Sequence, residues 1–546
     1  MLIKKIKQNK VAILLILILI LGFWIRLNGL NWGLPYIYFD DETIFISIVE
    51  NILQKGDWNP HYFNFPGTIL IYCITIVYGL GLIILNLNLF LSGHLPGFSE
   101  IIISSNINKL IYYYQNPVLA YYLGRFVSVI FAIITIFLVY KIASYMFDRK
   151  TGLIAGLVLA LAPLHIDQSR IIKVDIIATM FILVSFYYLI KFVDDNKNRL
   201  FLYLSSFFAG IAIGSKYPSV IIALLILFCI FDEFLNITGK ANRSKYIINN
   251  IFKPLILIFF GFFISSPYLI FNFKTSLSGL MFETRTTHLG QERLEFINQN
   301  IWYIQRVLID GTGGPTIFIV SLIGIFLLSI KFIRKLDKKI LLLFFFFFAY
   351  YIFIVWFGNL RWERWLIPIL PFFAIFFGYG VNQLNNHSTN LKTKANKYIV
   401  TLLIIFIISL TFTVNFIKEL NKGEVLTRKD TREIAKIWIE NNVPKKSSIV
   451  YEIFSPHLHV NKRNDLRLIN KGWKLVISES ILDYKSEKVD YIVISDIFKD
   501  LYEKEPNKYP DQIRKYRQLI KNSRLIKTFD NKNNPGPTIY VYKINY

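Results

Sequence analysis

The chain has 546 residues, of which 54% are hydrophobic and 16% aromatic, and its formal net charge is +25. Repeated apolar runs near the length of a membrane span exclude a water-soluble protein and indicate a polytopic α-helical membrane protein. The basic excess is typical of cytoplasmic loops that fix topology, so it does not argue for nucleic acid as a partner. Cys73 and Cys229 lie in apolar runs, which excludes a disulfide framework.

The N-terminal region predicts a signal anchor followed by a long outer loop. Residues 1–10 are basic, residues 11–29 are almost wholly apolar, and no small-residue cleavage site follows them. This pattern favours an uncleaved helix with a cytoplasmic N-terminus. Residues 31–116 then form a loop on the outer side. Within this loop, residues 42–55 have one apolar and one polar face and predict an interfacial amphipathic helix.

Residues 66–91 are long and apolar enough to cross the membrane, yet the later loops argue that they do not. If they crossed, every later basic loop would face outward, against the usual bias of basic residues toward the cytoplasm. We therefore predict that they lie in or dip into the membrane. Ten further spans are predicted at 117–146, 152–167, 174–193, 201–215, 217–234, 251–272, 314–332, 340–357, 363–382 and 397–417. With the first helix these make about eleven crossings.

Residues 418–546 are charged, contain no spanning run and predict a small α/β domain outside the membrane. Asp430 is a plausible N-cap for a helix ending near Asn442. Strands are predicted at 448–453, 491–495 and 538–543. The predicted domains are therefore a membrane domain, 1–417, and an extracytoplasmic domain, 418–546.

Acidic and basic residues converge on the outer face in this topology. An acidic cluster, Asp40, Asp41 and Glu42, follows the first helix. Carboxylates at the edge of a bilayer are expensive to desolvate, which favours a functional role for them. Other outer loops contribute His61, His165, Arg170, Lys173, Asp175, Lys216, Glu283, Arg285, Arg361 and Arg364.

This set of residues suits a lipid-phosphate substrate. An apolar tail can lie between helices, while Lys216 and Arg361 are candidates to bind the phosphate. The Asp41 carboxylate can deprotonate an acceptor hydroxyl as that oxygen attacks the anomeric carbon of a sugar. The departing phosphate is then stabilised by the basic side chains. No nucleotide-sugar-binding domain is evident, which also favours a lipid-linked donor.

Each candidate also has a purely structural alternative. Carboxylates at helix starts can cap free amides, lysines can extend toward the interface, and arginines beside tryptophans can anchor there. These alternatives apply to Asp40, Asp41 and Asp175, to Lys216, and to Arg361 and Arg364. His165 can equally be a polar residue at a helix end. The pair His457 and His459 alone is a weak metal signal.

Several short motifs resemble the protein O-mannosyltransferase and aminoarabinose transferase superfamily, which are C-type (GT-C) glycosyltransferases. Asp41-Glu42-Thr43, the amphipathic helix and Gly56-Asp57-Trp58 are similar to the family's first outer loop. Further motifs in the family's order are Leu123-Gly124-Arg125, Pro163 to Asp175, Lys216-Tyr217, Arg361 to Pro371, Asp430-Thr431-Arg432 and Gly536-Pro537. The motifs are individually short, but their ordered set covers nearly all of the chain.

The resemblance implies an inverting transfer from a polyprenyl-phosphate sugar to a protein, lipid or glycan acceptor at the outer face of the plasma membrane. It implies that Asp41 is the base, Asp175 helps shape the site and Lys216 contacts the donor phosphate. Glu42 joins the catalytic candidates, and His61, His165, Arg170 and Arg361 are the remaining candidates for substrate binding. No cofactor and no essential metal are implied. Phe65 stands where aminoarabinose transferases carry lysine, which argues against that sugar.

Two other classes of function compete with glycosyl transfer. A transporter or flippase of lipid-linked saccharides predicts charged residues at mid-bilayer in paired broken helices. This chain instead keeps its charges at one face. A non-catalytic membrane scaffold that binds a partner through its C-terminal domain is the third hypothesis.

Overall fold

The computed structural model describes residues 2–64, 66–91, 118–195, 198–235, 246–288, 290–389, 394–459 and 465–546. The chain divides into two compact units. Unit 1 contains Met1–Leu27 and Asp41–Leu420, and unit 2 contains Asn28–Asp40 and Asn421–Tyr546.

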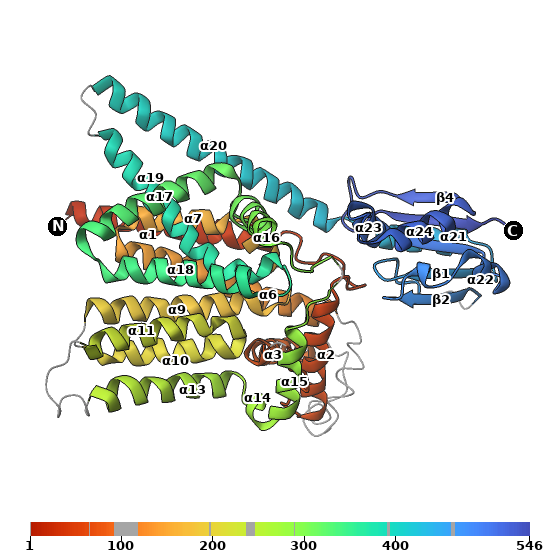
Figure 1. The fold of residues 1–546 in the computed structure, drawn as a ribbon, viewed down its shortest axis with the longest axis horizontal. Helices are drawn as coiled ribbons and strands as arrows, with labels where there is room; N and C mark the ends of the chain where they lie inside the picture. The colour runs from red at the N-terminus through yellow and green to blue at the C-terminus, as the bar shows by residue number, and fades with distance from the viewer. Residues whose placement is uncertain are drawn as a thin grey trace. The chain divides into compact units, whose positions relative to one another are not determined.

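Unit 1 is helical (Figure 1). The helices within the predicted outer loops are α2 (Asp40–Lys55), α3 (Thr68–Leu91), α14 (Tyr268–Phe271), α15 (Phe273–Glu283) and α16 (Phe296–Tyr303). The other long helices are α1 (Leu2–Leu27), α6 (Val118–Met146), α7 (Arg149–Ala160), α9 (Val174–Asp194), α10 (Arg199–Ser215), α11 (Val220–Leu235), α13 (Lys253–Ser265), α17 (Pro315–Lys335), α18 (Lys338–Phe357), α19 (Leu370–Thr389) and α20 (Lys394–Thr427). Shorter pieces are α8 (Pro163–Ser169), η1 (Tyr217–Ser219), η2 (Ile248–Phe252), η3 (Ile304–Ile309), η4 (Asp310–Thr312) and η5 (Glu363–Ile369).

The described helices confirm a polytopic helical membrane protein. Eight of them are long and apolar enough to cross a membrane, or nine if α7 and α8 are one span bent by 61°. Pro163 begins α8 and accounts for the break, because proline cannot continue the hydrogen-bond ladder of α7. The predicted total of about eleven is reached only when this bent pair and the shorter apolar helices α10 and α13 are counted.

Helices α9, α10, α11 and α13 run side by side (Figure 1), and glycines let α10 and α13 approach closely. A Cβ atom at Gly210 would lie 2.0 Å from the Ile258 carbonyl oxygen, and one at Gly261 would lie 2.1 Å from that of Phe207. Only glycine permits such backbone contact, which is a common way to pack helices in a membrane. The core beside them is aromatic, with the rings of Phe346 and Phe372 stacked at 4.6 Å between centroids.

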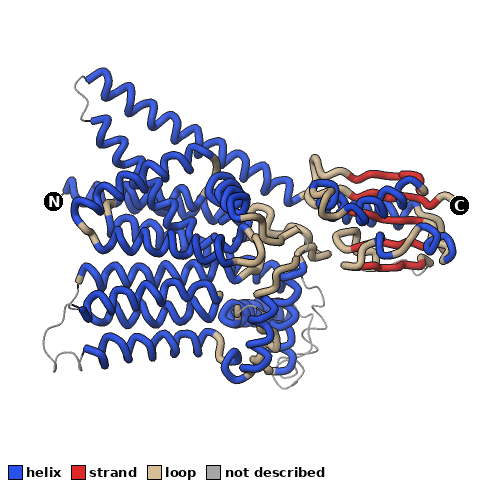
Figure 2. The backbone as a smooth tube through the Cα atoms, viewed as in Figure 1, coloured by secondary structure: helices blue, strands red, loops and turns tan. Residues whose placement is uncertain are grey.

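Unit 2 contains all the described strands (Figure 2). Its five-stranded sheet has the order β2-β1-β3-β5-β4, with β1 parallel to β2 and β3, and β5 antiparallel to β3 and β4. The strands are β1 (Ser448–Glu452), β2 (Arg467–Gly472), β3 (Tyr491–Ser495), β4 (Ser523–Phe529) and β5 (Ile539–Ile544). The helices are α21 (Thr431–Asn442), η6 (Val476–Ser478), α22 (Ile481–Ser486), α23 (Asp496–Lys504) and α24 (Pro510–Lys521).

Residues 28–40 belong to unit 2, although they lie far in sequence from its other residues, 421–546. The buried Tyr38 ring lies 3.6 Å from the Arg432 guanidinium carbon and makes an edge contact with His457 at 5.2 Å between centroids. Tyr36 lies under the Lys436 ammonium at 4.8 Å. These cation–π and aromatic contacts hold the segment to the C-terminal domain. The predicted boundary at 417/418 lies close to Leu420, but the assignment of residues 28–40 differs from the prediction.

Candidate functional site

A cavity of about 290 Å³ in unit 1 combines apolar walls with charged side chains. Its apolar walls include Leu280, Phe353, Ile354 and Phe357, from α15 and α18. Its charged residues are Lys173, Asp175, Lys216, Glu283 and Arg364. Deep apolar pockets with a few converging polar groups are typical of ligand sites.

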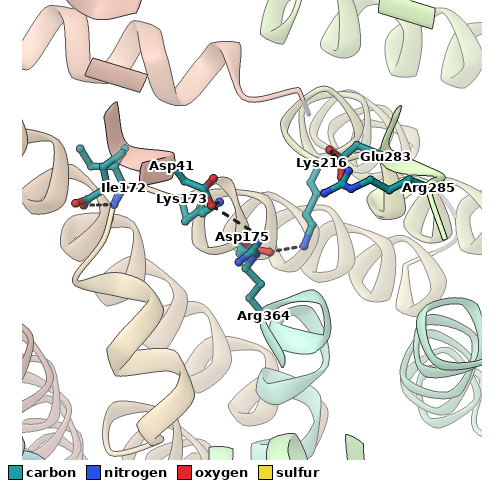
Figure 3. Close-up of polar contacts among 9 residues, drawn as sticks. Asp41, Ile172, Lys173, Asp175, Lys216, Glu283, Arg285 and Arg364 are labelled. Carbon is teal, nitrogen blue, oxygen red and sulfur yellow. Dashed lines mark hydrogen bonds and ion pairs between the residues drawn. The ribbon is translucent and has the colours of Figure 1, made fainter. Parts of the chain in front are cut away.

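Asp41, in the first turn of α2, lies at the end of a chain of charges that leads into this cavity (Figure 3). Its carboxylate forms an ion pair with Lys173, and a guanidinium nitrogen of Arg364 lies 4.0 Å from the same oxygen. Burial raises the pKa of Asp41, but the charges of Lys173 and Arg364 outweigh it and hold that pKa below its usual range. The lowered pKa keeps the carboxylate ionised. The side chain of Asp41 remains 34% exposed, so the carboxylate is also accessible.

Lys173 is almost fully buried and immediately precedes α9. Burial, together with the charge of Arg364, lowers its pKa to about 8, while the Asp41 carboxylate opposes this change. Such a lysine is a cation near neutral pH and loses its charge within the range in which many enzymes work.

Asp175 and Lys216 form a second ion pair at the cavity (Figure 3). Asp175 is in the first turn of α9, and Lys216 directly follows α10. The N-cap of α9 is Lys173 and shows no side-chain capping bond, so the Asp175 carboxylate is engaged by Lys216 instead. This contact weakens the alternative that Asp175 only caps a helix.

Glu42 is fully buried and has both carboxylate oxygens engaged. Arg125 Nε donates to one oxygen at 2.9 Å and Arg125 Nη2 to the other at 2.6 Å, which is a strong two-pronged geometry. The backbone N–H of Ile172 donates to Glu42 at 2.9 Å. Glu42 thus joins α2, α6 and the loop before α9. We propose a positioning role for Glu42 in place of the catalytic role predicted from the sequence.

His165 and Arg170 are buried near the end of α1 and do not line the cavity. The Nδ1 of His165 lies 2.8 Å from Arg26 Nη2. Arg26 also donates to the carbonyl oxygens of Leu159 and Ala160, at the break between α7 and α8. Arg170 donates to the Ile25 carbonyl oxygen at 2.8 Å. Their predicted role in substrate binding has no contact with the cavity to support it.

His61 and Arg361 also lie apart from the residues that line the cavity. The exposed His61 contacts Asp57 at 2.7 Å, within a loop stabilised by its own side chains. Arg361 donates to the Gly290 carbonyl oxygen at 3.2 Å and lies 5.6 Å from the Trp302 ring centroid. Arg364, three residues further on, takes the position at the cavity that was predicted for Arg361.

Three charged residues of the cavity were not selected from the sequence: Lys173, Glu283 and Arg364. All three belong to the outer-loop set, but lysine or arginine at a span end is also the usual interface anchor. Glu283 is paired with Arg285 at 3.2 Å (Figure 3). Phe65 lies outside the described residues. Among the residues described, no three His, Cys, Asp or Glu side chains gather as a metal site.

Residues 122–271 match the family model described as dolichyl-phosphate-mannose-protein mannosyltransferase. Among curated proteins, none matches this sequence. Solved structures with a similar fold include ArnT from Cupriavidus metallidurans in the apo state, at 12% identity and a TM-score of 0.53 over 98% of each chain. ArnT bound to undecaprenyl phosphate matches at 12% identity and a TM-score of 0.51 over 97% of each chain.

The archaeal oligosaccharyltransferase AglB from Archaeoglobus fulgidus, in complex with an inhibitory peptide and a dolichol-phosphate, matches at 12% identity and a TM-score of 0.54. That match covers 97% of this chain and 74% of the archaeal one. The fold and the family match together confirm the resemblance that the motifs predicted. The chain is an integral membrane protein whose residues 122–271 match this mannosyltransferase family model and whose fold is similar to that of ArnT.

Proposed function

We propose that this protein transfers a sugar from a polyprenyl-phosphate donor to an acceptor hydroxyl, with inversion at the anomeric carbon. The observation that carries the proposal is the accessible Asp41 carboxylate, ion-paired to Lys173 at the edge of a cavity that also contains Lys216 and Arg364. A carboxylate beside clustered cations suits a reaction in which a base and a leaving phosphate work together.

In the proposed step, Asp41 takes the proton of the acceptor hydroxyl as its oxygen bonds to the anomeric carbon. The bond from that carbon to the phosphate oxygen breaks, and the electron pair leaves with the polyprenyl phosphate. Lys173, Lys216 and Arg364 stabilise the negative charge on that phosphate. A single displacement of this kind inverts the configuration of the carbon.

The choice of a lipid-linked donor rests on the cavity and on the structural relatives. Leu280, Phe353 and Phe357 give an apolar wall beside the charged residues, as a prenyl chain attached to a phosphate requires. ArnT has been solved with undecaprenyl phosphate, and AglB with a dolichol-phosphate. We place the cavity on the outer face of the plasma membrane, because that topology leaves the later basic loops in the cytoplasm. The acceptor is a protein, a lipid or a glycan.

The proposal is tested in a strain that lacks the protein. Mass spectrometry of its cell-surface glycans, glycolipids and glycoproteins identifies the sugar that is lost, and complementation with the wild-type chain restores it. A strain whose surface sugars are unchanged, while its membranes accumulate a lipid-linked saccharide, would instead support the transporter hypothesis.

Replacing Lys216 by glutamine is expected to weaken binding of undecaprenyl phosphate about tenfold or more, because one charged contact to the phosphate is lost. Titration of the purified protein in nanodiscs with undecaprenyl phosphate measures the effect, after thermal unfolding has confirmed the folded fraction. The matched control is Lys338→Gln. Lys338 is also ion-paired to an aspartate, at 2.5 Å, but is 56% exposed and lies outside the cavity. Equal affinity of both variants would remove Lys216 from the phosphate site.

The rate of transfer is expected to fall as the pH rises through about 8, where buried Lys173 loses its proton. Asp41 remains ionised below and above this pH, so the proposed base is unchanged. The rate falls because the Lys173 cation, which stabilises the leaving phosphate, is lost. Arginine stays charged throughout this range. The Lys173→Arg variant should therefore keep its rate to higher pH. The same alkaline limb in wild type and variant would contradict this assignment.

A further inference from the structure

The chain passes between the two units at three places: after Leu27, before Asp41 and after Leu420. Four consecutive residues of unit 1, which we call segment 170–173, contact residues beside all three places. These contacts lie wholly within unit 1. None of them involves the apolar lining of the cavity.

Arg170 makes the contacts at two of these places. Its Nη2 donates to the carbonyl oxygen of Ile25 at 2.8 Å, two residues before α1 ends. Its Nη1 lies 3.7 Å from a carboxylate oxygen of Glu419, the last residue but one of unit 1 before the C-terminal crossing. Arg170 is 4% exposed, so this guanidinium is buried between α1 and α20 and compensated by Glu419 and by Asp167 at 3.8 Å.

The other end of segment 170–173, Ile172 and Lys173, contacts the residues beside the junction before Asp41. The N–H of Ile172 donates to Glu42, and Lys173 forms the ion pair with Asp41 (Figure 3). The Ile172 side chain is fully buried, and a Cβ at Gly124 would lie 2.6 Å from it. This end is therefore closely packed against Gly124, and we expect a displacement of Arg170 to be transmitted to it.

We propose that Arg170 is a positioning residue for the base: it fixes segment 170–173 against the end of α1 and against Glu419 of α20, so that Lys173 stands where it pairs with Asp41. This inference rests on the proposed function. It replaces the predicted role of Arg170 in substrate binding.

The test is a double-mutant cycle on the rate of sugar transfer. Membranes of the strain that lacks the protein hold native donor and unmodified acceptor, and each purified variant is added to them. Arg170→Gln is expected to lower the rate about 100-fold, the size of effect that a small misplacement at a site produces. If Arg170 acts through Lys173, the double variant with Lys173→Gln is no slower than Lys173→Gln alone. Effects that multiply would overturn the proposal.

Arg26→Gln is the matched control. Arg26 is as buried as Arg170 and lies close enough to interact with its charge and that of Glu419, but its hydrogen bonds go to Gly22, Leu159, Ala160 and His165, none of which belongs to segment 170–173. Arg26→Gln is expected to lower the stability of the protein as Arg170→Gln does. Its effect on the transfer rate should multiply with that of Lys173→Gln. The alkaline limb of the rate profile should stay at the same pH. Arg170→Gln should move that limb. An unmoved limb in Arg170→Gln, or the same displacement in Arg26→Gln, would assign Arg170 a purely structural role.

If Arg170→Gln does not fold, the cycle is carried out with Arg170→Lys, which keeps the charge but loses the two-sided reach of the guanidinium. Full activity of Asp41→Asn would refute the proposed function itself. Inactive Asp41→Asn with multiplicative effects of Arg170 and Lys173 would refute only the positioning role.

Discussion

Replacing Asp41 by asparagine is expected to lower the rate of sugar transfer about a thousandfold, within the range that general-base catalysis contributes. Asparagine keeps the shape of the side chain but cannot accept the hydroxyl proton. It also removes the charge that pairs with Lys173, so the fold is checked by thermal unfolding before the rate is read. The measurement is the amount of restored sugar, determined by mass spectrometry after complementation of the strain that lacks the protein.

Asp57→Asn is the control for this experiment. Asp57 belongs to the same predicted outer loop, but it pairs with exposed His61 and does not line the cavity. Its variant should restore the sugar fully. Full restoration by Asp41→Asn would show that Asp41 is not the base.

The second large effect is expected on stability. Replacing Arg125 by methionine leaves the Glu42 carboxylate buried without its cation, and breaking a buried pair in this way costs about 3–5 kcal/mol. The pair is 1% and 0% exposed on its two sides, so solvent does not screen it. Reversible unfolding in detergent micelles measures the loss. The sugar-transfer assay should also show reduced activity, because Glu42 holds the loop that carries Lys173.

Lys338→Met provides the comparison for Arg125→Met. It removes an ion pair that is 56% and 39% exposed, and such a pair contributes about 1 kcal/mol or less. A second comparison is the double variant Glu42→Leu with Arg125→Met, which removes both charges and should recover much of the lost stability. If Arg125→Met costs no more than Lys338→Met, the buried pair does not hold α2 and α6 together.

Much of the fold could be predicted because membrane helices carry their own signal. Each needs roughly twenty apolar residues, so α6 and α9 begin and end near the predicted residues. The strands β1, β3 and β5 are predictable because each is a short, largely buried run of apolar residues. Strands β2 and β4 lie at the two edges of the sheet and are not predicted, because the side chains of β2 are exposed or half-buried and those of β4 are mostly exposed. An exposed edge strand lacks the apolar pattern on which such predictions depend.

The candidate site was partly predictable for a different reason. Asp41, Asp175 and Lys216 stand where charges meet apolar runs, and that position is visible in the sequence. The separation of Arg361 from Arg364 was not visible, since both flank Trp362 and only the start of η5 decides which one faces the cavity. Arg170 and Lys173 are likewise neighbours with different surroundings. Their partners, Glu419 and Asp41, come from distant parts of the chain, and no local pattern encodes such contacts.

The membership of residues 28–40 in unit 2 has a consequence for biosynthesis. Tyr38 leaves the ribosome long before Arg432 and His457, whose side chains contact its ring. Contacts this far apart in sequence cannot form until unit 1 and the first part of the C-terminal domain have been synthesised. Residues 28–40 therefore reach their final packing only after α21 and the loop that follows β1 have been made.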